Sequence, residues 1–250
     1  MEIAEHIAAL RREGELLAAA AEDGALAATV PSCPDWTVAD VVRHVGGVHR
    51  WAASFVTLGR AEATTVEEDA VFFAAPADAD LLEWYRAAHA DLVVALSTAD
   101  PAVQCLSFLP APTPLAFWAR RQAHETAIHR VDVQLVSGSP TEVPPDFAVD
   151  GIEELLRCFY GPGRGRKLVA DPPRTIGIRP TDVDRAWTVR LEPTGRSVTD
   201  GAGAADLTLS GTVHELYLFL WNRAGEERVD VNGDRGVLDL WRERARIRWA

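Results

Sequence analysis

Residues 117–136 read FWARRQAHETAIHRVDVQLV and decide both the fold and the chemistry that we expect of this chain. Thr113 and Pro114 precede them, and a threonine cap followed by proline at the first helical position is a strong helix start. Within the predicted helix, Glu125 and His129 are four residues apart and lie on one face, one turn above the other. A carboxylate and an imidazole can therefore converge on one metal ion.

His124 looks like a further ligand, but the zinc-protease pattern H-E-x-x-H would need a histidine at position 128, which is Ile128. Residues five apart are roughly 140° apart around a helix. We therefore expect His124 to point away from the site that Glu125 and His129 form.

The third ligand should come from a helix predicted over residues 37–58, which starts at the capping box formed by Thr37 and Asp40. Its apolar stripe carries His44 toward the interior, so we take His44 as the ligand and His49, five residues on, as peripheral. A His/Glu/His set leaves open metal positions, as catalytic sites do. An ordinary hydrogen-bonded Glu–His pair is the alternative.

Two more amphipathic helices are predicted, and four such helices with short to medium links indicate a four-helix bundle. A mobile connection and a linker are expected between elements. The four helices are expected at residues 3–21, 37–58, 78–97 and 113–136. The connection is expected at 59–76, the linker at 137–147 and a short helix after the linker at 150–160.

The C-terminal third alternates apolar and polar residues at the period of a strand. Strands are expected at residues 175–180, 186–193, 205–211 and 229–234, a loop at 161–167, and helices after the Thr212 capping box and over 237–245. This is a small α+β unit. We expect two domains, a metal-binding helical bundle over residues 1–160 and the α+β unit over 168–250.

Composition excludes several function classes. A formal net charge of −12 argues against a surface that binds nucleic acid or anionic lipid, since both need clustered cations. Cys33, Cys105 and Cys158 show no metal or disulfide spacing. The acidic start lacks a signal-peptide pattern and no apolar run reaches the ~20 residues of a membrane span, so a cytoplasmic location is expected.

Two phrases, VPSCPDWTVADVVRHVGGVHRWA at 30–52 and FWARRQAHETAIHRVDV at 117–133, resemble the actinobacterial maleylpyruvate isomerase family of mycothiol-dependent enzymes, within the DinB-like four-helix metalloproteins. The shared pattern is Pro-x-Trp-Thr, a histidine eight residues after the tryptophan, and a later E-x-x-x-H. The resemblance implies that His44, Glu125 and His129 hold a divalent ion, usually zinc. The tail, DLTLSGTVHELYLFLWNR and VNGDRGVLDL, is similar to the family's sterol carrier protein-like C-terminal domain.

The resemblance also implies mycothiol as co-substrate, bound as a thiolate and added to a small electrophilic substrate, in an isomerase or S-transferase. Arg121 is the candidate catalytic residue, because a guanidinium can bind a carboxylate by paired hydrogen bonds. Asp132 is the candidate acceptor for His129. Solvated surface roles are the alternatives for both. The candidate residues of the thiol and substrate pocket are Gly47, Trp51, Trp118 and Gln122.

Two other function classes remain open at this point. A metal-dependent hydrolase would use bound water in place of the thiol. A non-catalytic module would use the metal to stabilise the bundle and the apolar tail to bind a ligand or to dimerise. We expect small-molecule partners, with no nucleic acid and no membrane, and a chain that acts as a monomer or a homodimer.

Overall fold

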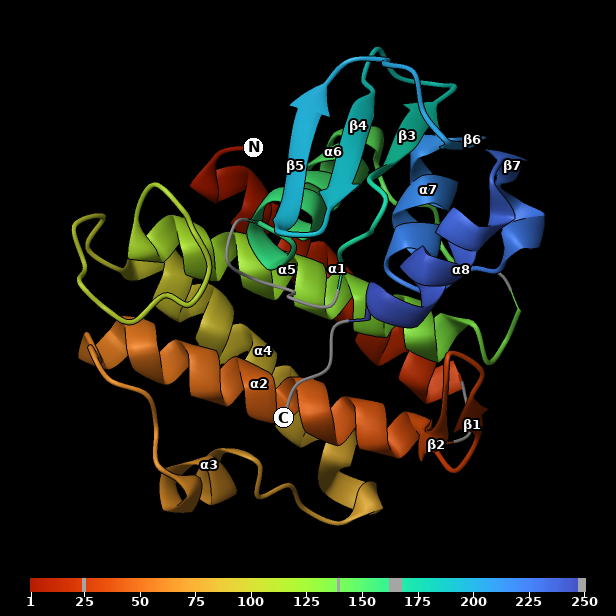
Figure 1. The fold of residues 1–250 in the computed structure, drawn as a ribbon. Helices are drawn as coiled ribbons and strands as arrows, with labels where there is room; N and C mark the ends of the chain where they lie inside the picture. Colours follow the sequence, from red (N-terminus) through yellow and green to blue (C-terminus); the bar gives the residue numbers. More distant parts are fainter. Residues whose placement is uncertain (24–25, 139, 162–167, 247–250) are drawn as a thin grey trace. The chain divides into compact units, whose positions relative to one another are not determined.

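The computed structural model describes residues 1–23, 26–138, 140–161 and 168–246 (Figure 1). Contacts within the chain divide it into two compact units, Met1–Thr141 and Glu142–Ala250. The first unit is dominated by helices and the second combines a sheet with helices, so the predicted α+β class is confirmed. Most of the predicted loop at 161–167 lies outside the described residues.

Four helices of 21 residues each form the body of the first unit, and all four were predicted. Helix α1 packs along α5, and α2 packs along α4. Helix α1 also contacts α4, and α2 also contacts α5, so the four helices form a bundle. Their bounds are α1 (Ile3–Asp23), α2 (Val38–Leu58), α4 (Asp78–Thr98) and α5 (Pro114–Gln134).

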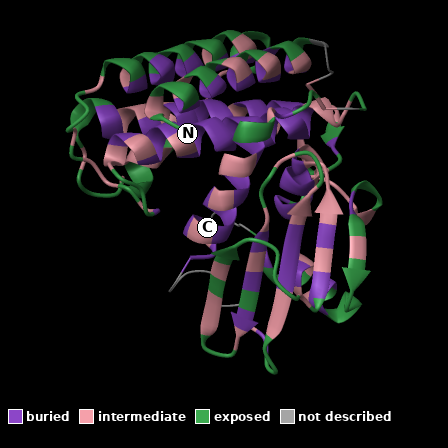
Figure 2. Ribbon diagram, turned by 90° about the horizontal axis from the view of Figure 1, so that it is seen from above, coloured by how far each residue is buried: buried purple, intermediate pink, exposed green. Residues whose placement is uncertain are grey.

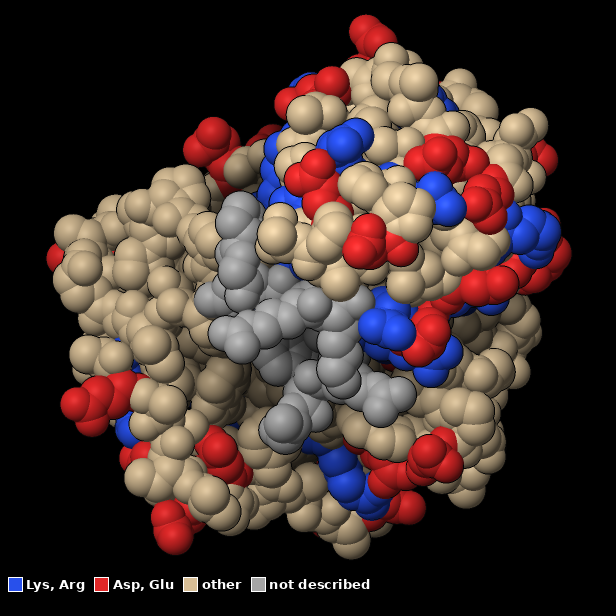
Figure 3. Space-filling view, viewed as in Figure 1, with Lys and Arg blue, Asp and Glu red and all other residues tan. Residues whose placement is uncertain are grey.

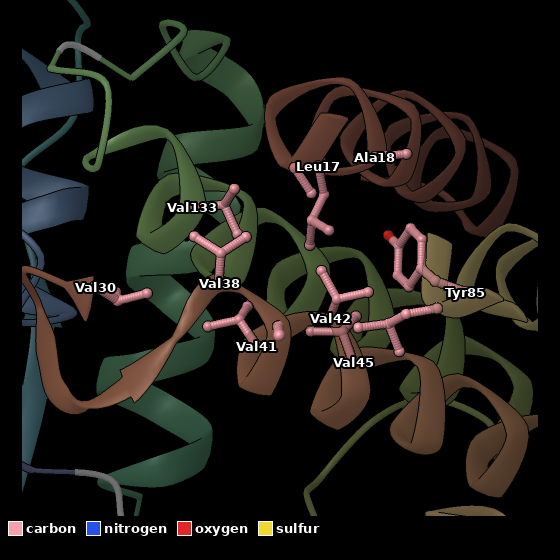
Figure 4. Packing of buried hydrophobic residues seen from close by; sticks show 12 residues of the cluster. Leu17, Ala18, Val30, Val38, Val41, Val42, Val45, Tyr85 and Val133 are labelled. Carbon is pink, nitrogen blue, oxygen red and sulfur yellow. The ribbon is translucent and has the colours of Figure 1, made fainter. Parts of the chain in front are cut away.

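Small and branched apolar side chains fill one end of this bundle (Figure 4). Three helices contribute Leu17 from α1, Val41 and Val45 from α2, and Val133 from α5, all essentially buried. Burying such side chains is the main favourable term in folding, at about 25 cal/mol per Å² of apolar area. Figure 2 shows the buried residues along the inner sides of the helices.

Helix α2 begins as predicted, with Thr37 and Asp40 forming a capping box. Its two internal glycines have a packing reason. A Cβ at Gly46 would lie 2.2 Å from the Trp84 ring, and one at Gly47 would lie 2.3 Å from the Phe73 ring. Each glycine therefore admits an aromatic side chain against the helix backbone.

The expected mobile connection at residues 59–76 contains a helix, α3 (Val66–Phe72), that the sequence reading missed. A capping box of Thr65 and Glu68 starts it, and acidic side chains in its first turn favour the helix N-terminus. None of its residues is buried, so it lacks the apolar period by which helices are found. The segment before α2 contains two short paired strands, β1 (Thr29–Val30) and β2 (Cys33–Thr37).

The second unit is built on a five-stranded sheet in the order β5-β4-β3-β6-β7, in which only the β3–β6 pair is parallel. The bounds of its strands are β3 (Arg174–Pro180), β4 (Trp187–Glu192), β5 (Gly195–Asp200), β6 (Leu207–Gly211) and β7 (Asp230–Gly233). Strand β5 was not predicted, because GRSVTD carries one apolar residue and buries none.

In the described part of this unit five helical segments accompany the sheet, and α7 contacts both β3 and β6. Thr212 caps α7 with a capping box, as predicted. The segments are α6 (Pro145–Glu153), the π-helix η1 (Glu154–Phe159), α7 (Val213–Leu220), the 3₁₀ turn η2 (Glu226–Arg228) and α8 (Arg235–Arg244).

The short helix expected over residues 150–160 begins earlier, at Pro145, inside the segment read as a linker. It packs against α7, and the indole nitrogen of Trp221 donates to the carbonyl of Gly151 at 3.2 Å. Contacts therefore group this helix with the second unit, whereas the sequence reading assigned residues up to 160 to the first domain.

The surface carries mixed charge. On the face shown in Figure 3, basic and acidic side chains are interspersed, with no single basic field among the described residues. Within the described residues, no helix combines the length and the hydropathy that crossing a bilayer requires.

Candidate metal centre

Three side chains from two helices converge on one point. Oε1 of Glu125 on α5 lies 3.2 Å from Nε2 of His129, one turn further along the same helix. The same oxygen lies 3.3 Å from Nε2 of His44 on α2. One ligand atom of each residue lies within 4.8 Å of the other two. The structure thus brings together the three residues that the sequence reading selected as ligands.

This donor set fits a divalent ion of the zinc type. Two imidazole nitrogens and one carboxylate oxygen are the ligands that such ions take, and ligands at 2.0–2.2 Å from a tetrahedral ion lie roughly 3.3–3.6 Å from one another. Both contacts of Glu125 are close to that spacing. The side chain of His44 is 20% exposed and borders solvent.

The carboxylate of Glu125 is held from two directions. Its Oε2 accepts a hydrogen bond from the guanidinium of Arg121 at 3.2 Å, while Oε1 faces the two histidines. Burial by itself would raise the pKa of Glu125. Hydrogen bonds from His129 and His44 and the charge of Arg121 outweigh burial and hold the pKa well below its ordinary value. Glu125 is therefore an anionic candidate ligand.

His129 is oriented by Asp132, which lies one turn along α5 and is fully buried. The ring nitrogen Nδ1 of His129 lies 2.9 Å from Oδ2 of Asp132, and the hydroxyl of Ser32 donates to the other oxygen. Burial lowers the pKa of His129, but its contacts with Asp132 and Glu125 dominate and raise it to about 9. With the Nδ1 proton held by Asp132, the Nε2 lone pair can face an ion.

Two aromatic side chains border the histidines, and the sequence reading gave neither a role in the site. The Trp36 ring lies 5.1 Å from that of His44 and stacks on that of His129 at 6.3 Å, measured between centroids. The Phe73 ring lies 6.3 Å from that of His44. Trp36 belongs to the quoted Pro-x-Trp-Thr pattern, which was a usable signal. Phe73 follows α3, where nothing in the sequence indicated a site.

Arg121 does not occupy the position of a solvated surface arginine. It is 1% exposed and donates to Glu125, so in this conformation it contacts a ligand carboxylate. A free carboxylate from solvent would have to displace that contact.

Three of the four predicted pocket residues, Gly47, Trp118 and Gln122, are buried in the bundle, and Trp51 is partly buried. Phe73 fills the space above Gly47. The Trp51 indole nitrogen donates to the Thr64 hydroxyl at 2.9 Å, and the ring of Trp51 contacts that of Trp118. Trp118 and Gln122 are buried: the indole nitrogen of Trp118 donates to Leu106, and the carbonyl of Gln122 accepts from the Thr126 hydroxyl.

The remaining histidines of α2 and α5 make other contacts. His124 is buried with its ring 6.2 Å from that of His6, as the helical geometry predicted. The expectation that His49 is peripheral was wrong, because His49 is fully buried. Its Nε2 lies 2.8 Å from the hydroxyl of Thr126, so a core hydrogen bond between α2 and α5 replaces the expected surface position.

Comparison with known proteins follows the same division of the chain. A family model described as the mycothiol maleylpyruvate isomerase N-terminal domain matches residues 7–134, and one described as the MDMPI C-terminal domain matches residues 146–240. Among curated proteins, no match was found.

Two solved structures share the fold. A crystal structure of the mycothiol-dependent maleylpyruvate isomerase aligns with a TM-score of 0.63 at 16% identity. That of a mutant in which alanine replaces a histidine aligns with a TM-score of 0.65 at 15% identity. Each alignment covers 93% of this chain and 93% of the other.

Proposed function

Because this chain belongs to the mycothiol maleylpyruvate isomerase family of enzymes, we propose that it activates mycothiol with a divalent ion, most simply Zn²⁺, for addition to a small electrophile. The observation that carries the proposal is the convergence of His44, Glu125 and His129. All three lie within the segment that the family model matches. The ion, held by these three side chains, would lower the pKa of a bound thiol.

The charges of the centre favour an anionic bound molecule. Without metal, Glu125 and Asp132 carry two negative charges, which Arg121 and a protonated His129 balance. Binding a divalent ion requires His129 to release its proton. With a divalent ion bound, the ion, Arg121, Glu125 and Asp132 together would carry one net positive charge, which a thiolate would neutralise. A neutral thiol would leave that charge uncompensated in a site of low dielectric.

The protein side chains fix the geometry of this reaction. Asp132 keeps the proton of His129 on Nδ1, and Arg121 keeps the second oxygen of Glu125 turned away from the histidines. We therefore propose that Arg121 positions Glu125 and does not bind a substrate carboxylate in this conformation. The four predicted pocket residues would pack around the ligand helices rather than touch the thiol; they are Gly47, Trp51, Trp118 and Gln122.

Thiol addition accounts for both reactions open to such a site. In an isomerase, the sulfur bonds to one carbon of a double bond and the thiol proton goes to the adjacent carbon or its conjugated carbonyl. Rotation about the resulting single bond and elimination then release the thiol unchanged. In an S-transferase, the adduct is the product.

We also propose that the first unit is a DinB-like metalloprotein bundle, with ligands on the facing helices α2 and α5. For the second unit we propose a sterol carrier protein-like domain, on the basis of its mixed sheet and the α7 helix that packs on it. The domain division proposed is that of the contacts, after Thr141.

Incubation of metal-loaded protein with a conjugated electrophile such as a cis-enedioate, with and without mycothiol, tests the reaction. We expect turnover only with the thiol, and loss of that turnover after chelation. Absence of turnover with any thiol across a panel of such electrophiles would contradict the proposal. Thiol-independent hydrolysis would identify a metal-dependent hydrolase instead, and metal binding with neither reaction would favour a binding module.

A further inference from the structure

We propose that Phe73 is a specificity-determining residue of this centre: its ring shields His44 from bulk water and offers an apolar surface to the carbon skeleton of the electrophile. The shielding stands on geometry alone. The contact with the electrophile rests on the proposed function, and the two are tested separately below.

The ring of Phe73 is seated on α2 next to the ligand. A Cβ at Gly47 would lie 2.3 Å from Cδ1 of Phe73, so the ring rests on helix backbone that only glycine leaves bare. Gly47 is three residues beyond His44, on the same side of the helix. Phe73 is 40% exposed, and that exposed part is available to a ligand.

Arg50, a further turn along α2, holds the segment that carries Phe73. Its guanidinium donates to the carbonyls of Val71 and Phe72 at 3.1 and 2.9 Å. Both carbonyls lie at the C-terminal end of α3, where the helix itself provides no hydrogen-bond partner and the helix dipole also favours a cation. The guanidinium lies 5.7 Å from the centroid of the Trp84 ring. Phe73 is thus the first residue after a fixed helix end.

The other end of the segment is tied to α2 as well. The indole nitrogen of Trp51 donates to the hydroxyl of Thr64, just before α3 begins, and that hydroxyl donates to Asp69 within α3. Three residues of α2, Gly47, Arg50 and Trp51, therefore set where Phe73 lies. A segment with no buried residue of its own acquires a defined position in this way.

A second aromatic side chain borders the ligand histidines. Trp36 stacks on His129 and meets His44 edge to face. Flat apolar walls suit a planar, conjugated carbon chain and exclude the ordered water that a hydrolase needs. A thiol competes better with water at a centre bordered in this way, which agrees with thiol addition rather than hydrolysis.

Shielding of His44 is measured on the metal-free protein, independently of any activity. Diethylpyrocarbonate modifies exposed imidazole nitrogens, and peptide mass spectrometry reports the rate at His44 alone. We expect the rate to rise at least threefold in Phe73→Ala, and also in Gly47→Ala, which displaces the ring without removing it. Val66→Ala is the control, since Val66 is 81% exposed on the same segment. Unchanged rates in both variants, with circular dichroism unaltered, would overturn the proposal.

The contact with the electrophile is measured on metal-loaded enzyme. We expect Phe73→Ala to raise KM for the electrophile about tenfold, the size of one lost apolar contact, with kcat and metal content little changed. Phe73→Leu should restore most of the loss, and Arg50→Ala should give a smaller rise because it removes the nitrogen Nη1 that donates to both carbonyls but leaves the Phe73 ring. An unchanged KM in Phe73→Ala would refute this contact. If wild-type enzyme has no thiol-dependent turnover, the proposed function and the electrophile contact both fail, and the modification rates still decide the shielding.

Discussion

Two histidines of α2, His44 and His49, both face α5 and have opposite environments. His44 borders solvent and meets the carboxylate of Glu125 at 3.3 Å. His49 is fully buried and meets the hydroxyl of Thr126, the next residue of α5, at 2.8 Å. The first contact belongs to a candidate metal centre, and the second is a hydrogen bond between two helices.

The difference shows that the neighbouring group, not the histidine, sets the chemistry. The Thr126 hydroxyl donates to the Gln122 carbonyl, so it can only accept from His49, whose Nε2 must carry the proton. Nδ1 of His49 has no hydrogen-bond partner among the described residues. Burial, together with the nearby His89 ring, holds the pKa of His49 well below its ordinary value. His49 is thus a neutral donor in the core, whereas His44 faces an anion.

The sharpest break of this comparison removes each histidine in turn. We expect His44→Ala and His129→Ala to weaken metal binding by more than roughly 100-fold, because even the loss of an outer-shell partner costs 10–100-fold. His49→Ala should keep the metal and lose stability instead. Metal content by mass spectrometry after dialysis measures this. Loss of metal in His49→Ala with retention in His44→Ala would reverse the assignment.

A smaller effect is expected from Asp132→Asn, which keeps the shape of the side chain and removes its charge. Its contact with Nδ1 of His129 should weaken, and metal affinity should fall about 10–100-fold. Competition with a chromogenic chelator measures the affinity. The control is Asp91→Asn, an exposed aspartate on α4. Equal affinities for both variants would show that Asp132 does not orient the ligand.

Thr126→Val tests the other side of the comparison. The change removes the acceptor of His49 and leaves a buried N–H without a partner, so the free energy of unfolding should fall by about 1–3 kcal/mol. Metal stoichiometry should stay at that of the wild type, and Thr126→Ser should restore most of the stability. Urea unfolding of both variants measures this. A loss of metal with unchanged stability would mean that the two contacts are not separate.

The sequence was sufficient for elements that combine an apolar period with a capping signal. The capping boxes led by Thr37 and Thr212, and the cap at Thr113, start their helices where predicted. Helix α3 and strand β5 were not predicted, because neither buries a residue and neither therefore shows a periodic pattern of apolar residues. The start of α6 at Pro145 was read as linker, because prolines mark loops and helix starts alike.

For the candidate site, spacing along a helix was informative and burial was not. The spacings of four and five residues on α5 separated Glu125 and His129 from His124. The five-residue spacing on α2 likewise distinguished His44 from His49. Spacing alone could not show whether His49 lies at the surface or is buried in the core with its own hydrogen bond. Phe73 is 29 residues from His44 in the chain, and only the fold brings their rings together.

A last effect expected in metal-free protein is a difference in how pH changes the stability contributions of His129 and His49. The folded-state pKa of His129, about 9, lies above its unfolded value near 6.5. Its contribution to stability is therefore complete below pH 6.5 and is lost as pH rises toward 9. His49 has a lowered folded-state pKa, so its contribution is complete above pH 6.5 and is lost as pH falls below it. Each slope is at most about 1.4 kcal/mol per pH unit, the value for one proton.

Urea unfolding of metal-free wild type, His129→Gln and His49→Phe between pH 5 and 9 measures these slopes. His129→Gln should flatten the dependence of stability on pH only at alkaline pH, and His49→Phe only at acid pH. Flattening in the same pH range by both would show that the two histidines share one environment.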